Sequence, residues 1–539
     1  MDYIEFYDKM HEIGLISGNW KNLIKLIALE LKDNLARDGI LKLLISYFSM
    51  IDDGDAYIDL NTESIKHKFD EKINKTKIQL DEELVGKAPK YDFDIILEAV
   101  TDACTSIKDL KTGRIIGKDK LFIYEEDTNR LYTRKYYNAV ITIRDSIKNL
   151  FKHNSPQKAC FDYHGIMESS FKLATEQEDI IDKGYYNNLI VTGGPGTGKT
   201  TSVFFLLLSL LNNNINSEVY LTAPSGKAAS RMKDSIMKSI SEIKDRKLCG
   251  DGVLEKIEST ETYTIHRLLE TDYHSGGFKH NRKNTFSPNS IFVIDEASMI
   301  DLCLFASLLE AIPEGARVFI LGDKNQLPSV ECGAVFADLL DIIDSKNKVE
   351  LTKSIRFSED SEIYRLSSAI NNGECMPVTE EEWLQWDKFE VMEDKNIIYY
   401  YSDNATKPTD MIDQVVSQWA KKYCSDLQAL CTDIDEDENI FEKILIAAEQ
   451  ARILCASNNG IRGTKYINKI ILDKCFDKNN KKSGFCAGEL LMIDQNNKAL
   501  NLYNGDNGVA VTFKGDDTLY VMLKKATELN LDEGKKENR

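Results

Sequence analysis

Short, continuously apolar runs alternate with longer amphipathic segments along the middle of the chain. Such runs begin at residues 188 (NLIVT), 218 (EVYLTA), 290 (SIFVI) and 317 (RVFILG), and each leads through a loop towards a segment of helical character. Buried strands that alternate with helices are typical of a parallel sheet covered by helices. The carboxyl ends of parallel strands meet at one edge of the sheet, where functional loops gather. The pattern therefore predicts an α/β fold whose chemistry lies in the loops after these strands.

The first 150 residues show a different pattern and carry no obvious catalytic motif. Apolar positions spaced near 3.6 residues predict one or two amphipathic helices, with a buried side formed by Leu23, Ile24, Ile27, Leu31 and Leu35. We interpret this region as a helical domain for recognition or packing rather than for catalysis.

Composition and charge narrow the class of protein. The 539 residues suffice for several domains, and 42% hydrophobic with 29% charged residues is an ordinary globular balance. The net charge of −19 means that the overall field of the protein would not hold nucleic acid. Much of the acidity lies between residues 374 and 450, including DIDEDE at 433–438. We expect this block to form a solvated outer face, which leaves a local groove elsewhere free to contact nucleic acid.

No segment of the sequence predicts membrane insertion, secretion or a structural metal. The apolar run at 203–211 is too short to cross a bilayer, and the acidic N-terminus lacks the layout of a signal peptide. The eleven cysteines include no CxxC pair, and the seven histidines show no metal-binding spacing. We therefore expect a cytoplasmic protein with reduced cysteines and no membrane partner.

The segment GGPGTGKTT contains the phosphate-loop pattern, in which a glycine is followed by four residues and then by Gly-Lys-Thr. Glycines let successive backbone N–H groups curl around phosphate oxygens, and the N-terminus of the following helix favours the same anion. Lys199 supplies a charge for the β- and γ-phosphates, and the Thr200 hydroxyl suits Mg²⁺. The predicted nucleotide-binding residues of this loop are Gly193, Gly194, Pro195, Gly196, Thr197, Gly198, Lys199, Thr200 and Thr201.

An acidic pair ends the apolar run FVIDEAS at 292–298. We predict that Asp295 holds the Mg²⁺ ion and that Glu296 polarises the water that attacks the γ-phosphate. An acidic pair alone is often a solvated turn, but after a phosphate loop it indicates the second half of one site. Together the two motifs predict hydrolysis of a nucleoside triphosphate.

The segment GDKNQLP follows the next apolar run. Gln326 is a candidate sensor of the γ-phosphate, which it could connect to a bound strand of nucleic acid. The alternative is a plain turn built from Gly322, Asp323 and Pro328. The residues of this segment alone leave both interpretations open.

Six motifs occur in one order along the chain: GGPGTGKTT (193–201), APSGKAASRM (223–232), TIHRLL (264–269), DEAS (295–298), GDKNQLP (322–328) and LTKSIRF (351–357). This series resembles that of superfamily 1 DNA helicases of the RecD type. Further similar segments extend the resemblance over roughly residues 160–515. No single motif is unique to this family, but the ordered set is specific. The size of the chain looks more like the RecD subunit of a RecBCD exonuclease complex than like the longer stand-alone RecD-like helicases.

The resemblance implies a fold and an activity. It implies two RecA-like P-loop motor domains and an ATP-dependent 5′–3′ DNA helicase, a motor subunit of a RecBCD-type exonuclease that acts in double-strand break repair by recombination. ATP and Mg²⁺ would be the cofactors, with single-stranded DNA and RecB-like and RecC-like subunits as partners. We expect a partner-docking helical domain at 1–150, motor domain 1 at 151–350 and a partial motor domain 2 at 351–539. A small β-barrel-like insertion, or simply a pinning hairpin, is expected around 485–525.

The resemblance also implies roles for single residues. Gln177 would read the adenine edge, although a solvated glutamine at a helix start is the alternative. Arg356 would reach the γ-phosphate from the second motor domain, since a guanidinium suits a developing phosphoryl charge. The residues that would contact single-stranded DNA are Ser225, Lys227, Thr264 and His266. A packed or helix-capping histidine is the alternative for the last of these.

The sequence departs from the family pattern after residue 515. The last family motif, which resembles T-V-H-K-S-Q-G, and the arginine-bearing helix after it do not occur in the 539 residues. We therefore expect a chain shortened at its C-terminus or a protein that has lost part of the second motor domain. The alternatives to a motor subunit are a nucleotide-binding subunit that does not unwind DNA and a stand-alone RecD-like helicase. Nuclease activity is not expected of this chain.

Overall fold

The chain forms two compact units, which are described separately below. The computed structural model describes residues 55–59, 105–106, 122–125, 127–128, 130–152, 173–244, 251–272, 274, 276–327, 329, 331–355, 361–374, 383–385, 399–401, 408–435, 437–476, 484–493, 507–516 and 518–523. The first unit comprises residues 1–224 and 235–353, and the second comprises residues 225–234 and 354–539. The three-part domain division expected from the sequence stays a prediction.

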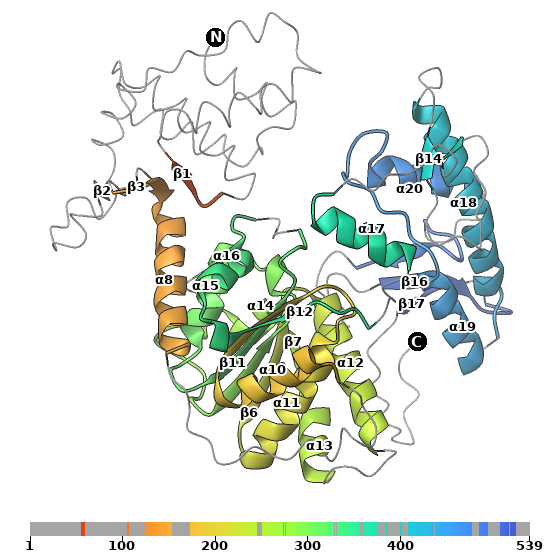
Figure 1. The fold of residues 1–539 in the computed structure, drawn as a ribbon. Helices are drawn as coiled ribbons and strands as arrows, with labels where there is room; N and C mark the ends of the chain where they lie inside the picture. The colour runs from red at the N-terminus through yellow and green to blue at the C-terminus, as the bar shows by residue number, and fades with distance from the viewer. Residues whose placement is uncertain are drawn as a thin grey trace, which may run out of the picture. The chain divides into compact units, whose positions relative to one another are not determined.

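A six-stranded parallel sheet forms the centre of the first unit (Figure 1). Its strand order is β12 (Lys348–Leu351), β5 (Leu189–Gly193), β11 (Arg317–Gly322), β10 (Ser290–Ile294), β6 (Glu218–Ala223) and β7 (Thr262–Thr264). Every residue of the three strands β5, β11 and β10 is buried, which explains why their sequences are continuously apolar rather than alternating. The predicted α/β fold with a parallel sheet is confirmed.

Helices cover both faces of this sheet (Figure 1). On one face α11 (Lys199–Asn213) packs against α10 (Thr175–Tyr186) and α13 (Asp251–Glu258), and ten consecutive α11 residues, 202–211, are buried. On the other face a hydrophobic core joins the sheet to α15 (Leu302–Ala311) and α16 (Val335–Ile342). The short α14 (Ile265–Leu269) belongs to this second core, and α12 (Gly226–Lys244) follows β6. Apolar side chains therefore cover the central strands β5, β11 and β10 on both faces of the sheet.

The described part of residues 1–150 contains strands as well as a helix. Helix α8 (Arg134–Leu150) packs against α15, and its buried residues are Tyr136, Ala139, Ile143, Ile147 and Leu150. A small sheet precedes it, in the order β1 (Tyr57–Asp59), β4 (Arg130–Thr133), β3 (Phe122–Glu125) and β2 (Thr105–Ser106). The expectation of a helical region is therefore incomplete, because these strands are too short to give a clear alternating pattern. The predicted helices around residues 23–35 lie outside the described residues.

The second unit is built from helices and a small antiparallel sheet. Its helices are α17 (Glu362–Asn371), α18 (Pro408–Cys431), α19 (Glu438–Glu449) and α20 (Thr464–Cys475). Its main sheet has the order β15 (Leu490–Met492), β16 (Asn507–Thr512) and β17 (Leu519–Leu523). This sheet lies within the region where a β-rich insertion was expected, but a closed barrel is not seen among the described residues. Residues 494–506 of the expected insertion lie outside them.

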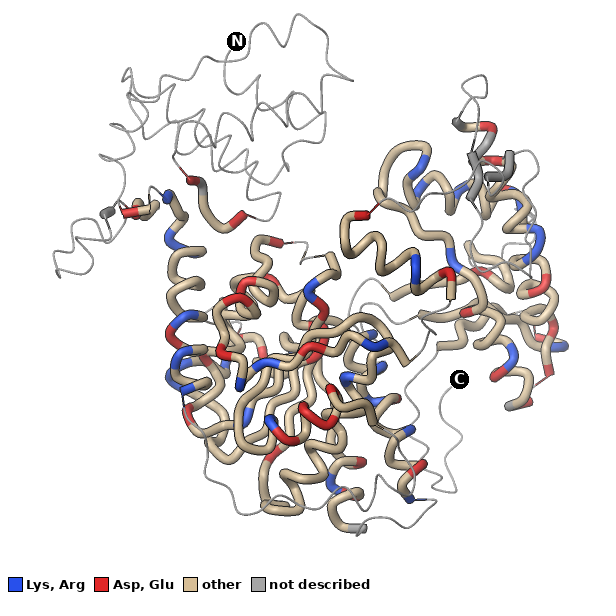
Figure 2. The backbone as a smooth tube through the Cα atoms, in the orientation of Figure 1, with Lys and Arg blue, Asp and Glu red and all other residues tan. Residues whose placement is uncertain are grey.

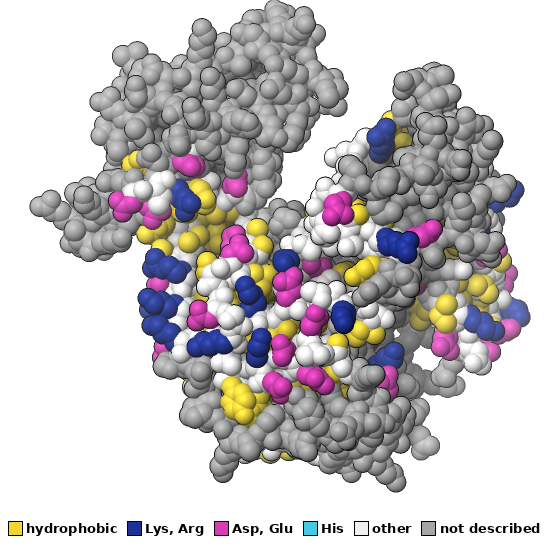
Figure 3. Space-filling view, in the orientation of Figure 1, with side chains coloured by type: hydrophobic (Ala, Val, Ile, Leu, Met, Phe, Trp, Pro, Cys, Tyr) yellow, Lys and Arg dark blue, Asp and Glu magenta, His cyan; other side chains and the backbone are white. Residues whose placement is uncertain are grey.

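Charged side chains of both signs are interspersed along the described backbone (Figure 2). On the face drawn in Figure 3, basic side chains follow α8, where Arg144 and Lys148 are exposed. In the acidic segment at 433–438, Asp433, Asp435 and Asp437 are exposed, and Asp435 forms a solvent-exposed ion pair with Lys514 at 2.7 Å. These three carboxylates agree with the predicted solvated face. Among the described residues, no helix is both long and apolar enough to cross a membrane.

Candidate functional site

The phosphate-loop segment connects the C-terminal end of β5 to the N-terminus of α11. Gly196 and Gly198 adopt φ angles of +74° and +85°, a left-handed conformation that favours glycine. Gly193 is required for a different reason, since a Cβ there would lie 2.8 Å from Cβ of Leu351 and 2.9 Å from Oγ1 of Thr197. Gly194 faces open space, and a Cβ at this position would meet no atom within 4 Å. The loop is therefore tight against the protein on one side and open on the other.

The N-terminus of α11 is suited to an anion. Gly198 is its N-cap residue and supplies no side-chain hydrogen bond, so the first N–H groups of the helix lack a side-chain cap. Thr197 is buried, and its hydroxyl donates to the carbonyl of Gly194 at 2.9 Å, which holds the loop closed on itself. Together these features place unsatisfied backbone donors at the end of a helix whose dipole favours negative charge.

Lys199 lies at the centre of the site. Its Nζ donates to the carbonyl oxygens of Gly193 and Gly194, at 2.5 and 3.1 Å. Burial lowers the pKa of Lys199, while the nearby carboxylates of Asp295, Asp323 and Glu296 raise it. The structure therefore brings together three of the predicted residues, Lys199, Asp295 and Glu296, across about a hundred residues of sequence.

Asp295 and Glu296 follow the last residue of β10. The pKa of Asp295 is raised to about 6, chiefly by burial and also by the Glu296 carboxylate, while the Glu296 backbone N–H and the Lys199 ammonium act in the opposite direction. That N–H lies 2.8 Å from Oδ1 of Asp295. Glu296 has a φ of +51°, an uncommon value for a residue with a side chain. Strained backbone of this kind is concentrated at functional sites, where the surrounding structure enforces it.

The loop after β11 adds a carboxylate that the sequence did not assign to the site. Asp323 is buried; its Oδ1 accepts from the Asn325 N–H at 3.0 Å, and its carbonyl accepts from the Gln326 N–H at 3.2 Å. A turn is thus present at this motif, as in the alternative interpretation, and Pro328 lies outside the described residues. The Gln326 side chain is half-buried, and its role as a γ-phosphate sensor stays a prediction. The position of Asp323 at the C-terminal end of a predicted strand was the signal that could have included it.

Gln177 is buried, with 2% of its surface exposed, so the alternative of a solvated glutamine is wrong. Its Oε1 accepts from the backbone N–H of Ala174 at 3.0 Å, which caps α10. Its Nε2 donates to the carbonyl of Thr197 at 3.0 Å. Gln177 therefore ties the start of α10 to the phosphate loop. Its expected contact with adenine stays a prediction.

The residues expected to contact DNA lie at or just after the C-terminal ends of two neighbouring strands. β6 and β7 pair in parallel, with Ala223 opposite Thr264. The Thr264 hydroxyl accepts from the Arg267 N–H at 3.3 Å and so caps α14. His266 is exposed, and its ring centroid lies 5.8 Å from that of Phe278 in an edge-to-face arrangement.

Two other expected DNA contacts lie at the start of α12. The Ser225 hydroxyl accepts from the Ala228 N–H at 3.2 Å, and Lys227 is exposed. Arg356, expected to reach the γ-phosphate, lies outside the described residues. None of these expected roles is tested by the positions of the residues.

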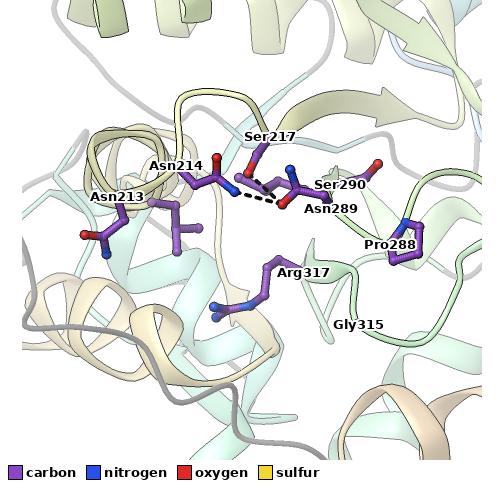
Figure 4. A pocket seen from close by; sticks show the side chains of 10 residues that line it. Asn213, Asn214, Ser217, Pro288, Asn289, Ser290, Gly315 and Arg317 are labelled. Carbon is purple, nitrogen blue, oxygen red and sulfur yellow. Dashed lines mark hydrogen bonds between the residues drawn. The ribbon is translucent and has the colours of Figure 1, made fainter.

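A polar pocket lies away from the phosphate loop, around the loop before β6 and the N-terminal ends of β10 and β11 (Figure 4). Its walls include Asn213, Asn214, Ser217 and Asn289, and Arg317 lies at its side. The Asn214 amide and the Ser217 hydroxyl both donate to Oδ1 of Asn289, at 2.9 and 3.3 Å. No residue of the phosphate loop lines this pocket.

Arg317 lines this pocket, but its guanidinium hydrogen-bonds mainly to backbone carbonyls. Its guanidinium donates to the carbonyls of Gly184, Tyr185 and Asn187, at 2.5, 3.1 and 2.9 Å, at the C-terminal end of α10. It also donates to Oδ1 of Asn188 at 3.3 Å. Burial lowers the pKa of Arg317 to about 10. We therefore interpret Arg317 as a structural cation that caps a helix.

Comparisons with known proteins agree with the motif series. The AAA domain family matches residues 177–332. The chain is 32% identical over 338 residues to the RecBCD enzyme subunit RecD of Mycolicibacterium smegmatis. The aligned region covers 60% of this chain and 54% of that protein. It is 25% identical over 514 residues to the RecD subunit of Buchnera aphidicola subsp. Acyrthosiphon pisum, covering 86% of this chain and 78% of that one.

A further relative is the ATP-dependent RecD2 DNA helicase of Deinococcus radiodurans, 33% identical over 204 residues, or 38% of this chain and 24% of that protein. The chain spans about half the length of the Mycolicibacterium relative. The similarity to RecD-type helicases that the motifs indicated is confirmed.

Proposed function

We propose that this chain is an ATP-dependent 5′–3′ DNA helicase, the motor subunit of a RecBCD-type exonuclease that acts in double-strand break repair by recombination. The observation that carries the proposal is the position of Lys199 within electrostatic reach of Asp295, Asp323 and Glu296, at the start of an uncapped helix after a parallel strand. A cation, free backbone donors and carboxylates at one sheet edge are what binding and hydrolysis of ATP require.

The residues at this edge fit a triphosphate with Mg²⁺. The side chain of Lys199 and the N–H groups at the start of α11 would hold the phosphates, on the side where Gly194 leaves open space. The hydroxyl of Thr200 and the carboxylate of Asp295 would hold Mg²⁺, since hydroxyl and carboxylate oxygens are ligands it accepts. When bound, the ion would neutralise charge that develops on the β- and γ-phosphates.

Glu296 is our candidate for orienting the attacking water and accepting its proton. The φ of +51° at Glu296 sets the direction in which its side chain projects from the backbone after β10. Gln326 and Arg356 would contact the γ-phosphate and couple its binding to the binding of single-stranded DNA. Gln177 would read adenine through the N–H and lone pair that its hydrogen bonds to Thr197 and Ala174 leave unused.

The proposed DNA contacts are compatible with the capping roles of two hydroxyls. Thr264 and Ser225 each accept a hydrogen bond from a backbone N–H, so the O–H of each remains able to donate to a phosphate oxygen. Lys227 and His266 are exposed, and each would contact the backbone of single-stranded DNA without reading its sequence. We also propose that residues 1–150 dock RecB-like or RecC-like subunits, and that the complex is cytoplasmic.

The test compares Lys199→Ala with Lys183→Ala. Lys183 is a lysine of α10 whose ion pair with Asp179 is solvent-exposed, so its loss should change neither folding nor activity. We expect Lys199→Ala to lose binding of a fluorescent ATP analogue and ATP hydrolysis stimulated by single-stranded DNA. Unchanged turnover in Lys199→Ala would refute the proposed site. ATP binding without any DNA-stimulated hydrolysis by the unmodified chain would favour a nucleotide-binding subunit that is not a motor.

A stand-alone helicase is the second candidate, favoured by the similarity to the Deinococcus protein. The two candidates differ in the partners that the chain needs. If the purified chain unwinds a duplex with a 5′ single-stranded tail as a monomer, the stand-alone function is supported. If unwinding appears only after RecB-like and RecC-like subunits are added, the subunit function is supported.

A further inference from the structure

Helices α18 and α20 of the second unit pack against each other over several turns. The Tyr466 hydroxyl on α20 donates to Oδ1 of Asp413 on α18 at 3.3 Å. Further along both helices, Val416 packs with Ile467 and Ile470 in a small hydrophobic cluster. The contacting residues follow one another in the same order on both helices. The two helices therefore run parallel along one shared contact face.

Cys424 and Cys475 lie near the far end of this shared face. Cys424 is two four-residue steps beyond Val416 on α18, and Cys475 is two such steps beyond Ile467 on α20. Side chains four residues apart lie on the same side of a helix. Both thiols are partly exposed, so a small reagent in solvent can reach them.

The two thiols also lie within hydrogen-bonding reach of each other. Their interaction raises the pKa of Cys424 and lowers the pKa of Cys475, because a proton held by Cys424 stabilises the Cys475 thiolate. A thiolate is the form that reacts with oxidants. The pair thus combines a reactive sulfur with a second sulfur in direct contact.

We propose that Cys424 and Cys475 form a reversible disulfide bond that fastens α18 to α20 when the protein meets a peroxide. The Cys475 thiolate attacks one oxygen of hydrogen peroxide, the O–O bond breaks, and a sulfenic acid and hydroxide form. Cys424 then gives up its proton, and its sulfur attacks the sulfenic sulfur. The S–O bond breaks, and the second hydroxide leaves. The two hydroxides take up two protons, so two thiols and one peroxide give one disulfide and two waters.

The bond would connect two clusters of the second unit. Towards its C-terminus, α18 leaves the cluster around Val416 and contributes Leu427 and Cys431 to a second cluster with α19 and β16. Cys424 lies between these two clusters along the helix. A disulfide there would prevent the end of α20 from separating from α18, and it would close a long loop, which lowers the entropy of the unfolded chain. We therefore expect the oxidised form to unfold at a higher temperature.

The experiment uses the whole reduced chain, treated with hydrogen peroxide, alkylated, digested and analysed by mass spectrometry. We expect a cross-linked pair of peptides containing Cys424 and Cys475 that disappears after dithiothreitol, and a Tm that rises by a few degrees on oxidation and returns on reduction. Cys424→Ser and Cys475→Ser should each abolish the cross-link and the Tm shift. Cys455→Ser is the matched control, since Cys455 is also partly exposed and packs against the cluster around Val416.

Three results would overturn the proposal. The first is oxidation of either cysteine to sulfenic or sulfinic acid with no bond between the two. The second is preferential cross-linking of either one to another cysteine of the chain. The third is a Tm shift that Cys455→Ser abolishes and Cys424→Ser leaves intact. The peptide map of the unmodified chain decides the first two even if a serine variant does not fold. None of these results depends on ATP hydrolysis, so they leave the proposed motor function untouched.

Discussion

The side-chain amide of Gln177 donates a hydrogen bond to the backbone carbonyl of Thr197 at 3.0 Å. The first turn of α10 is thereby joined to the loop before α11, within the first unit. Because Gln177 is buried and its other amide atom caps α10, the loop and the helix start share one hydrogen-bonding side chain. Loss of this residue should therefore affect both folding and the loop.

We expect Gln177→Ala to lower the free energy of unfolding by about 1–3 kcal/mol, since it leaves the Ala174 N–H and the Thr197 carbonyl without their partner. Chemical denaturation measures this change. If Gln177 also contacts adenine, the variant should lose more affinity for ATP than for GTP. Equal losses for both nucleotides would leave Gln177 a loop support only. Asp179→Ala is the control, because Asp179 is exposed on the same helix and forms only a surface ion pair.

Replacement of Glu296 should separate binding from hydrolysis. Glu296→Gln keeps the shape of the side chain but removes the base, so we expect hydrolysis to fall by about 10²–10⁴-fold with unchanged nucleotide affinity. Glu296→Gly should also lose hydrolysis. Its free energy of unfolding should nevertheless be about 1 kcal/mol higher than that of the unmodified chain, because glycine tolerates the φ of +51°. Steady-state turnover, nucleotide titration and denaturation test these three expectations. Normal turnover by Glu296→Gln would remove Glu296 from the mechanism.

Two adjacent glycines should respond differently to the same change. Gly193→Ala would bring a methyl group to 2.8 Å from Cβ of Leu351 and 3.0 Å from its carbonyl oxygen. We expect a loss of about 1–3 kcal/mol in the free energy of unfolding, since neither neighbour can move easily. Gly194→Ala meets nothing within 4 Å and should change stability by less than about 0.5 kcal/mol. Similar losses in both variants would contradict the described loop.

The sequence predicts the parallel sheet and the phosphate loop because both depend on local patterns. Continuous apolar runs mark strands buried on two faces, and the glycine spacing around Lys199 marks a loop of defined conformation. The same reasoning places Asp295 and Glu296 near Lys199, because the C-terminal ends of parallel strands share an edge. These predictions need no knowledge of which strands are neighbours.

Features that depend on contacts between distant segments were not predictable in this way. The end of a predicted strand places Asp323 at the same edge of the sheet, but its electrostatic effect on Lys199 depends on β11 being the direct neighbour of β5, and a local sequence pattern does not predict strand order. The burial of Gln177 requires the packing of α10 against α11. The short strand β1 pairs with a distant segment, since Tyr57 lies opposite Tyr132 of β4, so its own sequence gives little signal.

Arg317 gives the last prediction, because it is a buried cation whose partners are backbone carbonyls. Arg317→Ala would leave the carbonyls of Gly184, Tyr185 and Asn187 without these donors, and we expect the free energy of unfolding to fall by at least about 3 kcal/mol. Arg317→Lys should recover only part of this loss, since one ammonium cannot match the planar fork. Arg144→Ala, at an exposed arginine of α8, should change stability by less than about 0.5 kcal/mol. Urea denaturation of the three variants tests the order, and a loss in Arg317→Ala no larger than in Arg144→Ala would refute the capping role.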